Sequence, residues 1–570
     1  MSTTEERDRV VLELFEQVLE IEQRLIPTGL HIFGRVSDNA QLADLLRMVA
    51  SFDRPECGTR ALPDLVATGL GLPTYTTLLK ESTTSNERLT ARERVESLVN
   101  AAIKTLLLQG PDQAASLLRV QANVPTAESE KIFALLTRLR EQLKVDTEMD
   151  SLMRALRGEY ITPGPGADIV QNPDILPTGR NTHAVNPYAI PSAVALQKAK
   201  PVVEALLERH RCEQGHYPSA LAMVLWGMDN IKTQGESVAQ ALWLLGVTPR
   251  RDSLNRATEL DVVPLEQLGR PRIDVVMTVS GIFRDLFAPT MALLDQAVRQ
   301  VAQLDEPYEM NFIKHHVEKQ CREENCSFDT AVVRVFSNAA GIYGTNVNFM
   351  ILDSQWEQDE AIADLFITRK CFAYGRGLAG REARTLMERA LARVEATYQN
   401  IDTTEIGITD VDHYFEYLGG VTKAVQKRTG IRPQVYLSDT LTPGVKIRSL
   451  AEAVQLETRT KTLNPKWYEG MLKHGFRGVA EIEHHVSNTF GWSATADAVE
   501  NWIYDEVAQT YLLDEEMLAR LRSLNPHSTR NLVVRMLEAV GRGFWKADEQ
   551  TLDRLHEIFH GLEDKLEGID

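Results

Sequence analysis

The sequence predicts a multi-domain α/β protein with a helical N-terminal region, a parallel-sheet middle region and a helix-rich C-terminal region. The central prediction rests on two short apolar runs, at 220–225 and 273–279. Each leads through a polar turn into a helical pattern, at 236–245 and at about 284–303. A strand, a turn and a helix that follow one another twice are typical of a parallel sheet. Apolar residues at helical spacing on both sides predict the helical flanks.

Helical periodicity begins close to the N-terminus. Apolar residues from Val11 onward recur at intervals of three and four, and Pro27 ends the pattern. The same spacing returns at 94–108 and 128–143. We therefore expect a mainly helical domain over residues 1–150.

A Pro- and Gly-rich segment, 151–192, follows the helical region. Its part 158–191 reads GEYITPGPGADIVQNPDILPTGRNTHAVNPYAIP and contains six prolines. Tyr, Ile, Val and Leu are spread through it, and a flexible linker does not usually carry such residues. We expect an ordered, extended segment that lies over a surface.

The alternation of strand and helix continues further along the chain. Two more apolar runs, at 332–336 and 435–437, lead into the polar sequences SNAAGIYGTN and SDT. We expect an α/β domain with parallel strands over 193–330, a second α/β region over 331–445 and a helix-rich region over 446–570.

Composition excludes several classes of protein. The chain has 62 basic and 80 acidic residues, a formal net charge of −18, which disfavours binding to DNA and to anionic lipid. No apolar run approaches the roughly 20 residues of a membrane span. The start, MSTTEERDRV, has no apolar signal region, and the five cysteines are scattered. We expect a cytoplasmic protein with no nucleic-acid partner.

Two short motifs match the residues of catalytic patterns, but the sequence around them does not fit. GRGLAG at 375–380 has dinucleotide-loop spacing, but the preceding FITRKCFAY is not the apolar strand that such a loop requires, so we interpret it as a turn. HEIFH at 556–560 has zinc-helix spacing, but GLEDKLEGID after it supplies no third ligand. The chain has no phosphate-binding loop of the form G-x-x-x-x-G-K-[ST], and we assign no metal site.

Polar residues follow the predicted strands at the edge where parallel sheets bind their ligands. Asp229, Asn230 and Lys232 come after the first strand, and Arg284 and Asp285 come after the second. The same residue types also cap helices, so capping remains the alternative for each of them.

Long segments of the chain, in one order, match a known family. They include TPGPGADIVQNPDILPTGRNTHAVNPYAIP, VLWGMDNIKTQGESVAQALWLLGV, LGRPRIDVVMTVSGIFRDLF, RVFSNAAGIYG, ITDVDHYFEYLGG and ETRTKTLNPKWYEGMLKHG. Together they resemble the large, porphyrin-binding H subunit of magnesium chelatase and, more loosely, the large subunit of aerobic cobalt chelatase. DVDHYFEYLGG resembles the bacteriochlorophyll type more than the plant type.

The resemblance implies ATP-dependent insertion of Mg²⁺ into protoporphyrin IX in (bacterio)chlorophyll biosynthesis. Mg²⁺ is then a substrate, and ATP is bound by separate AAA+ partner subunits of the I and D type, which agrees with the missing phosphate-binding loop. Two alternatives remain open. One is a non-catalytic tetrapyrrole-binding or assembly module, and the other is a cobalt chelatase fragment that acts in cobalamin biosynthesis.

The resemblance covers only the C-terminal half of the family's chain. The family's first half carries an H-G-x-x-E segment implicated in chelation, and this sequence has no such segment. The chain is then a fragment, a split subunit that pairs with a separate N-terminal half, or a descendant that lost the chemistry.

Metal insertion needs carboxylates, a general base and an apolar slot, because a porphyrin loses two N–H protons and Mg²⁺ must shed water. We favour Asp410 and His413 as the catalytic pair, since positions i and i+3 share one face if this turn is helical. Glu236 is the second carboxylate candidate. An N-cap and a packed histidine are the alternative for the pair, and a first-turn acid is the alternative for Glu236.

Binding of the porphyrin requires cations beside its propionates and polar side chains along the pocket. Arg and Ser or Asn also serve as ion-pair partners and turn residues, which is their alternative role. The predicted substrate-binding residues are Arg369, Lys370, Arg284, Asp285, Asp229, Asn230, Lys232, Ser337, Asn338 and Asn346.

Overall fold

The computed structural model describes residues 11, 14–15, 18, 20–21, 24, 26, 29–36, 38–54, 58–82, 85–166, 168–170, 172–183, 185–403, 405–440 and 445–569. They fall into two compact units. The first holds the described residues of 11–24 and 31–183, and the second holds those of 184–440 and 445–569 together with 26, 29 and 30. Pro27, the predicted end of the first helix, lies outside the described residues.

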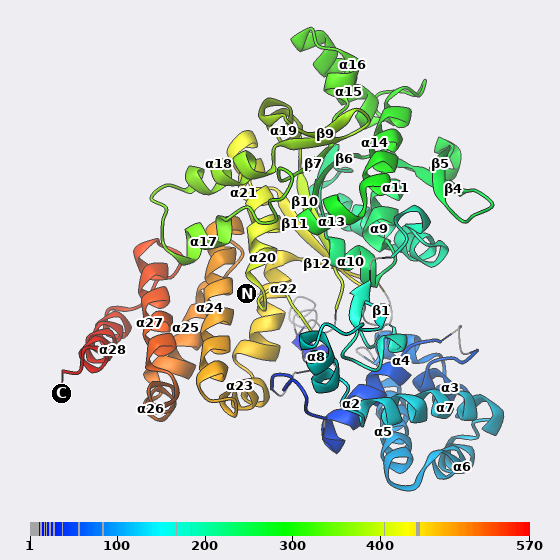
Figure 1. The fold of residues 1–570 in the computed structure, drawn as a ribbon, viewed down its shortest axis with the longest axis vertical. Helices are drawn as coiled ribbons and strands as arrows, with labels where there is room; N and C mark the ends of the chain where they lie inside the picture. Colours follow the sequence, from blue (N-terminus) through cyan, green and yellow to red (C-terminus); the bar gives the residue numbers. More distant parts are fainter. Residues whose placement is uncertain are drawn as a thin grey trace. The chain divides into compact units, whose positions relative to one another are not determined.

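The first unit is built from helices, as its periodicity predicts (Figure 1). The stretches 94–108 and 128–143 lie within α5 (Asn86–Gln109) and α7 (Thr126–Leu143), whose apolar faces join one hydrophobic core. Side-chain caps fix helix starts here; the Ser85 hydroxyl, for example, accepts from Arg88 N at the start of α5. Further helices are α2 (Asn39–Ala50), α3 (Leu62–Gly69), α4 (Tyr75–Glu81), α6 (Pro111–Ala122) and α8 (Glu148–Leu156).

The Pro- and Gly-rich segment is not extended from its first residue, because 151–156 belong to α8. The described residues after them form short strands, single turns of 3-10 helix and loops. In the first unit, β1 (Pro163–Pro165) pairs in parallel with β2 (Asn181–His183). Arg180 fixes the connection between them, because its guanidinium donates to a series of main-chain oxygens, those of Asp174, Ile175, Leu176 and Pro177. In the second unit, Ile190 is buried in the core.

The described residues of the second unit form an eight-stranded sheet with the order β12-β11-β10-β3-β6-β7-β8-β9 (Figure 1). The central strands β11, β10, β3, β6 and β7 are parallel, and β12, β8 and β9 pair in antiparallel fashion. The strands are β3 (Ala220–Leu225), β6 (Asp274–Val279), β7 (Val335–Ser337), β8 (Phe372–Gly375), β9 (Leu378–Glu382), β10 (Ala396–Ile401), β11 (Gln434–Asp439) and β12 (Lys446–Ser449).

The predicted parallel sheet is confirmed. The runs at 220–225 and 273–279 form β3 and β6, which pair along their whole length. The run at 332–336 becomes strand only at its end, because Val332 still caps the short helix α16 (Phe328–Ala331).

Strand β10 carries polar side chains although it lies between β3 and β11. Thr397 and Asn400 are buried, and each has a partner far away in the sequence. The hydroxyl of Thr397 is 2.8 Å from that of Thr422, and Gln240 Nε2 donates to Asn400 Oδ1 over 3.1 Å. These bonds offset the desolvation of the polar groups. An apolar pattern is absent, which explains why this strand was not predicted.

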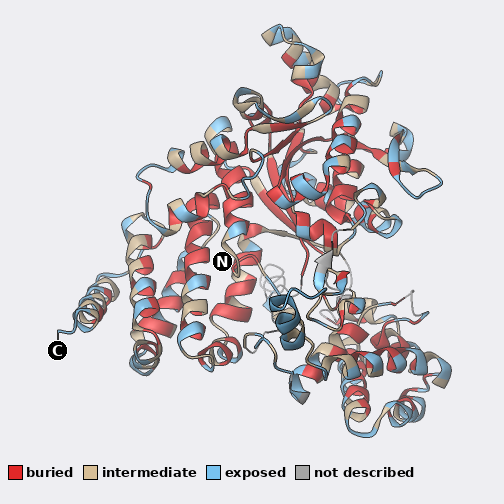
Figure 2. Ribbon diagram, in the orientation of Figure 1, coloured by how far each residue is buried: buried red, intermediate tan, exposed pale blue. Residues whose placement is uncertain are grey.

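Helices cover both faces of the sheet (Figure 1). α9 (Ala193–Gln214), α11 (Glu236–Leu245) and α14 (Ala288–Ala302) share a hydrophobic core with β3 and β6. α18 (Asp359–Lys370) and α21 (Gly420–Thr429) lie on the opposite face. Figure 2 shows the strands between these layers as almost wholly buried.

Shorter elements complete this part of the second unit. The predicted helix at about 284–303 is divided into α13 and α14, which meet at Phe287. The elements are η3 (Pro187–Ala189), α10 (Gly227–Lys232), β4 (Val247–Arg251), β5 (Ala257–Val262), α12 (Leu265–Leu268), α13 (Gly281–Leu286), α15 (Phe312–Glu324), α17 (Val347–Leu352), α19 (Arg384–Leu391) and α20 (Asp412–Tyr414).

The C-terminal part is helical, as predicted. Three one-turn π-helical segments interrupt the regular helices, namely η4 (Phe415–Gly419), η5 (Thr458–Thr462) and η6 (Gln509–Leu513). The helices are α22 (Leu450–Glu457), α23 (Pro465–Leu472), α24 (Phe476–Ala496), α25 (Asn501–Ala508), α26 (Glu515–Leu524), α27 (Pro526–Gly541) and α28 (Glu549–Glu567). Most of the length of α24 is buried (Figure 2).

The motifs GRGLAG and HEIFH lie in a hairpin turn and on an exposed face of a helix. GRGLAG forms the turn of the β8–β9 hairpin, where Gly375, Gly377 and Gly380 all have positive φ. His556 and His560 of HEIFH are exposed on α28. Within the part of the chain that the structure describes, no helix is long and apolar enough to cross a membrane.

Candidate functional site

Polar residues gather around Trp226 at the carboxyl ends of the parallel strands. Trp226 follows β3 directly, and its indole Nε1 donates to Gln399 of β10 over 3.1 Å. Its ring lies between two tyrosines, with centroid distances of 5.7 Å to Tyr414 and 4.6 Å to Tyr417. Two groups of polar residues lie in this region, a carboxylate group beside β10 and a lysine group beside the end of β6.

The carboxylate group consists of Asp229, Lys232, Glu236, Asn400 and Asp402. Lys232 Nζ lies 3.0 Å from Asp402 Oδ2, and Asn400 Nδ2 lies 3.5 Å from Asp229 Oδ1. Asp229 is only 1 % exposed. Burial, followed by the charge of Asp402, raises the pKa of Asp229 to about 7. Its Oδ2 is buried and accepts no hydrogen bond from any described residue.

Glu236 lies at the start of α11 and is buried. Its Oε1 accepts from Lys198 Nζ at 2.7 Å and its Oε2 from the Thr440 hydroxyl at 3.3 Å. Gly235 before it has φ +93°, and a Cβ there would lie 2.5 Å from Cγ2 of Ile190. Glycine is therefore required for the tight turn that places Glu236.

Asn230 has a structural place in this group. Its amide nitrogen donates to the Trp226 carbonyl over 2.7 Å, and its Oδ1 accepts from Ser237 at 3.1 Å. Both bonds join α10 to its neighbours. Asn230 is therefore a linking residue inside α10 and not a helix cap, while Asp229 and Lys232 face Asn400 and Asp402.

The lysine group is formed by Lys370, Tyr417, Asn338 and Glu416. Lys370 is fully buried, and its Nζ donates to the Val279 carbonyl over 2.7 Å. Its Nζ also lies 3.8 Å from the centroid of the Tyr417 ring. Burial lowers the pKa of Lys370 well below its usual value, against the opposing charge of Glu416.

Arg284 uses its guanidinium to hold the loop after β7. It donates to the main-chain oxygens of Ala339 and Ile342 at 2.7 and 2.8 Å, and pairs with Asp285. Tyr343 closes this arrangement, since its hydroxyl donates to Asp285 over 2.6 Å. Arg284 and Asp285 therefore shape the loop from within.

The three polar residues predicted around the GIYG turn are brought together at this end of the sheet. Ser337 Oγ donates to the Val279 carbonyl over 2.9 Å, and Asn338 Nδ2 donates to the Gly344 carbonyl over 2.9 Å. The main-chain nitrogen of Asn346 donates to Glu416 Oε1 over 2.9 Å. Arg369 lies apart from them as a partly exposed residue in the last turn of α18.

Asp410 and His413 do not share a helical face, so that expectation was wrong. The backbone at Val411 is extended, with φ −131° and ψ 138°, because α20 begins only at the next residue. Asp410 instead pairs with Lys461 and, at 2.7 Å, with His485 Nε2. Burial alone would raise the pKa of Asp410, but the charges of His485 and Lys461 hold it well below its usual range.

Glu416 is the acid that sequence reasoning missed. It is fully buried in the π-helical segment η4, and it accepts from Thr345 N, from Thr345 Oγ1 at 2.9 Å and from Asn346 N. His413, which is 60 % exposed, donates its Nδ1 proton to Glu416 over 2.8 Å, and this bond raises the pKa of His413. π-helical turns often occur at functional sites. The i, i+3 spacing of His413 and Glu416 was the available signal.

Glu457 accepts hydrogen bonds from main-chain N–H groups of the loop that precedes Asp410, as Glu416 does for the loop at Thr345. Its carboxylate accepts from Ile408 N at 2.7 Å and from Thr409 N at 2.9 Å. A Cβ at Gly407 would lie only 2.0 Å from Glu457 Oε1, so the loop requires glycine at this position. The loop that carries Asp410 is therefore fixed from α22 and α24.

An apolar rim lies beside these polar groups. We define it as Met228, Ile282, Ile342 and Tyr343, which follow β3, β6 and β7 and are 37–54 % exposed. Glycines allow the loops to meet: a Cβ at Gly227 would lie 2.5 Å from Ile282 Cγ2. Exposed apolar side chains that cluster around polar groups are typical of a binding surface.

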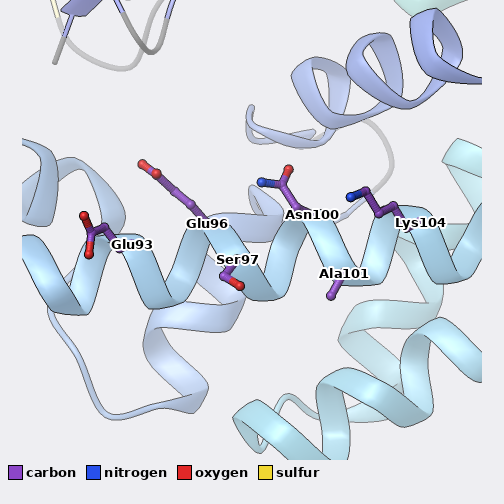
Figure 3. Close-up of a pocket in the computed structure, with 6 residues that line it drawn as sticks. All are labelled: Glu93, Glu96, Ser97, Asn100, Ala101 and Lys104. Carbon is purple, nitrogen blue, oxygen red and sulfur yellow. The ribbon is translucent and has the colours of Figure 1, made fainter. Parts of the chain in front are cut away.

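The first unit has a separate hollow along one helix. Figure 3 shows it on α5, lined by Glu93, Glu96, Ser97, Asn100, Ala101 and Lys104. Glu96 already accepts from Tyr75 and Arg92, and all six residues come from the one helix. We assign this hollow no function.

The fold and the candidate site define an α/β protein in which carboxylates, a buried amine and an apolar rim lie at the carboxyl edge of a parallel sheet. The CobN/Magnesium Chelatase family model matches residues 1–552, and the chain belongs to this family.

The relatives fit this assignment. The chain is 44 % identical over 595 residues to the chloroplastic ChlH subunit of magnesium chelatase from Oryza sativa subsp. indica, and covers 43 % of that protein. It is 44 % identical over 428 residues to the magnesium-chelatase H subunit of Cereibacter sphaeroides, which is 75 % of this chain and 36 % of that one. The chain thus spans less than half the length of these relatives.

A solved structure confirms the fold. The catalytic subunit of cobaltochelatase from Mycobacterium tuberculosis matches with a TM-score of 0.91 and 33 % sequence identity. The match covers 99 % of this chain and 47 % of the other. The mixed α/β architecture is therefore that of a chelatase large subunit.

Proposed function

We propose that the second unit binds a tetrapyrrole at the carboxyl edge of its sheet, as the C-terminal half of a magnesium chelatase large subunit. The reaction is the ATP-dependent insertion of Mg²⁺, a substrate, into protoporphyrin IX. The observation that carries the proposal is the apolar rim beside two buried groups, Asp229 and Lys370, whose pKa values are shifted towards neutrality.

The rim supports binding of a flat, apolar macrocycle. Ile282 and Tyr343 are 39 % and 54 % exposed, and they offer the apolar area that such a ligand buries. Their loops are fixed by Arg284 and by the glycines at 227 and 281, so the surface is preformed. A preformed surface loses less conformational entropy on binding.

The two buried groups support the proton transfers. A porphyrin releases two N–H protons when a metal enters. The pKa of Asp229 is raised to about 7 and that of Lys370 is lowered, and a pKa closer to the working pH suits a proton acceptor. The Trp226 ring in this region lies beside those of Tyr414 and Tyr417.

The carboxylate group supports delivery of the metal ion. Mg²⁺ prefers oxygen ligands and loses water reluctantly. Asp229 offers an oxygen without a hydrogen bond from the described residues, and Asp402 and Asn400 lie beside it. In this proposal these oxygens replace water on Mg²⁺ before transfer, while Lys232 balances the charge of Asp402.

Cobalt insertion is the second candidate. The cobaltochelatase structure matches nearly the whole chain, so the fold alone suits either metal. The identity of 44 % to the magnesium-chelatase subunits, against 33 % to that structure, favours magnesium. A non-catalytic binding module is the outcome if the chain binds porphyrin and supports no insertion.

The relatives are more than twice as long as this chain, and this difference bears on the partners. We propose that a separate N-terminal half and AAA+ subunits of the I and D type complete the enzyme, and that these subunits bind ATP. The test combines the full chain with such partners and ATP, and follows Mg-protoporphyrin by its fluorescence. Insertion of Mg²⁺ but not of Co²⁺ supports the proposal, and insertion of Co²⁺ alone supports the second candidate.

A further inference from the structure

We propose that His210, His216 and Glu395 form a binding site for a divalent transition-metal ion of the zinc class at the amino edge of the sheet. Their ligand atoms all lie within 4.8 Å of one another. Among the described residues, this is the one group of three such side chains that meets this distance. Six residues of β10, about 20 Å of strand, separate it from the site at the carboxyl edge.

The main chain places the three side chains independently of any metal. His210 lies in the last part of α9, and Gly215, with φ +84°, ends that helix and turns His216 back beside His210. The two rings approach edge to face with a centroid distance of 5.9 Å. Glu395 precedes β10, where its main-chain nitrogen donates to the Ala220 carbonyl over 3.0 Å.

The distances suit a metal after a small inward movement, in which Nδ1 of His216 gives up its 3.0 Å contact with the Tyr217 carbonyl. Glu395 Oε2 lies 3.5 Å from His216 Nδ1 and 3.9 Å from His210 Nε2. In a tetrahedral zinc site, with ligands about 2.0–2.1 Å from the metal, the ligand atoms are about 3.3 Å apart. Two imidazoles and one carboxylate are a donor set that suits zinc, with the fourth position left to water.

The buried nitrogen of His210 is the second, independent observation. His210 is 1 % exposed, and its Nε2 has no hydrogen-bond partner among the described residues. Tyr436 donates its own proton to Glu213 over 2.6 Å, so the Tyr436 oxygen is left to accept from His210 Nδ1, 3.5 Å away. The lone pair of His210 is then on Nε2, and it faces the carboxylate oxygen of Glu395.

A cation between the buried Nε2 of His210 and the partly exposed carboxylate of Glu395 would give both lone pairs a partner. The other oxygen of Glu395 is fixed, because Oε1 accepts from Ser219 N at 3.0 Å and from Ser219 Oγ at 2.5 Å. Such outer contacts orient a ligand for its metal.

Access to the site is through His216, whose side chain is 61 % exposed. A bound ion would join the end of α9 and the loop after it to the start of β10. The site is therefore a clamp between two elements of the second unit, and its metal is distinct from the ion that the carboxyl edge is proposed to handle.

The test titrates Co²⁺, as a spectroscopic probe, into the full chain freed of metal with a chelator and without porphyrin. We expect one Co²⁺ per chain with the visible absorption of a tetrahedral site, and its displacement by Zn²⁺. His216→Ala and Glu395→Gln should each raise the Kd at least tenfold. Zn²⁺ should raise the Tm of the wild type and leave that of His216→Ala unchanged.

A matched control is His484→Ala. His484 is half exposed, and its Nε2 lies 3.8 Å from Glu483, so it pairs one imidazole with one carboxylate. This change should leave the Co²⁺ titration unaltered. Since His216 is exposed, His216→Ala should keep the metal-free Tm of the wild type. The proposal is overturned if the wild type binds no Co²⁺, or if His216→Ala and Glu395→Gln bind it as the wild type does.

Discussion

His485 Nε2 lies 2.7 Å from the carboxylate of Asp410, across 75 residues of sequence, and Lys461 pairs with the same carboxylate. This relationship replaces the expected partnership of Asp410 with His413. It attaches the loop after β10 to α24, and Trp467 packs against the His485 ring with a centroid distance of 4.5 Å. Asp410 is thus a positioning residue for the segment that carries His413 and Glu416.

Asp410→Asn should destabilise the second unit by about 2–3 kcal/mol at pH 7, because it leaves the buried Lys461 and His485 without the carboxylate that they both contact. The lowered pKa of Asp410 means that its contribution is present above the unfolded pKa of about 3.9 and is lost as the pH falls further. Urea unfolding followed by tryptophan fluorescence measures the difference.

The matched control for this prediction is Asp305→Asn, since that carboxylate is fully exposed beside Lys314. It should change stability little. Equal effects of the two substitutions would contradict a structural role for Asp410.

Asp229→Asn should change how stability depends on pH. The raised pKa of about 7 means that wild-type Asp229 favours folding while protonated, and that this contribution is lost as the pH rises through 7. Between pH 5.5 and 8 the wild type should lose about 2 kcal/mol relative to Asp229→Asn, which stays neutral. Urea unfolding at both pH values gives the comparison. A difference that does not change with pH would show that the carboxyl group is not protonated in the folded state.

Lys370→Met should separate binding from chemistry. The methionine fills the buried space of the lysine stem but accepts no proton, so kcat for metal insertion in the assembled enzyme should fall about 100-fold. The KM for porphyrin should change less than about threefold, as expected for a group used mainly in the transition state.

Lys466→Met is the control for Lys370→Met, because Lys466 is exposed at the start of α23. It should leave kcat unchanged. If Lys370→Met raises the KM for porphyrin and leaves kcat unchanged, Lys370 acts in binding alone.

Gly281→Ala should damage the apolar rim. A Cβ at this position would lie 2.6 Å from Cδ1 of Tyr343 and 3.0 Å from its Cα, so the loop after β7 must shift. We expect a loss of stability of about 1–3 kcal/mol and about tenfold weaker porphyrin binding. Gly541→Ala in α27 is the control, since a Cβ there meets no described atom within 4 Å. Equal porphyrin affinities of the two variants would argue against the rim.

The sequence was sufficient for the elements whose apolar residues follow a regular period. Helix α11 and strand β3 were predicted at their observed bounds and β6 within one residue, because runs such as 220–225 are apolar throughout. Strand β10 was missed, since Thr397 and Asn400 are buried only because Thr422 and Gln240 supply hydrogen bonds from elsewhere.

Some residues of the candidate site could likewise be predicted from the sequence, and others could not. Position after a strand was enough to place Asp229 and Lys232 at the carboxyl edge, because the topology of a parallel sheet brings such residues to one edge. Glu416 and Glu457 were not found, since their partners at Thr345 and Thr409 lie 71 and 48 residues away. Asp410 was assigned the wrong partner because a single extended residue interrupts the local spacing.

The most direct test of tetrapyrrole binding is a fluorescence titration of the full chain with a soluble porphyrin, comparing wild type, Ile282→Asp and Ile431→Asp. Ile431 is exposed before β11, at the amino edge of the sheet, so it receives the same change away from the rim. We expect saturable micromolar binding by wild type and Ile431→Asp, and at least tenfold weaker binding by Ile282→Asp. Absence of saturation, or equal affinities of the two variants, would contradict a tetrapyrrole site at the carboxyl edge.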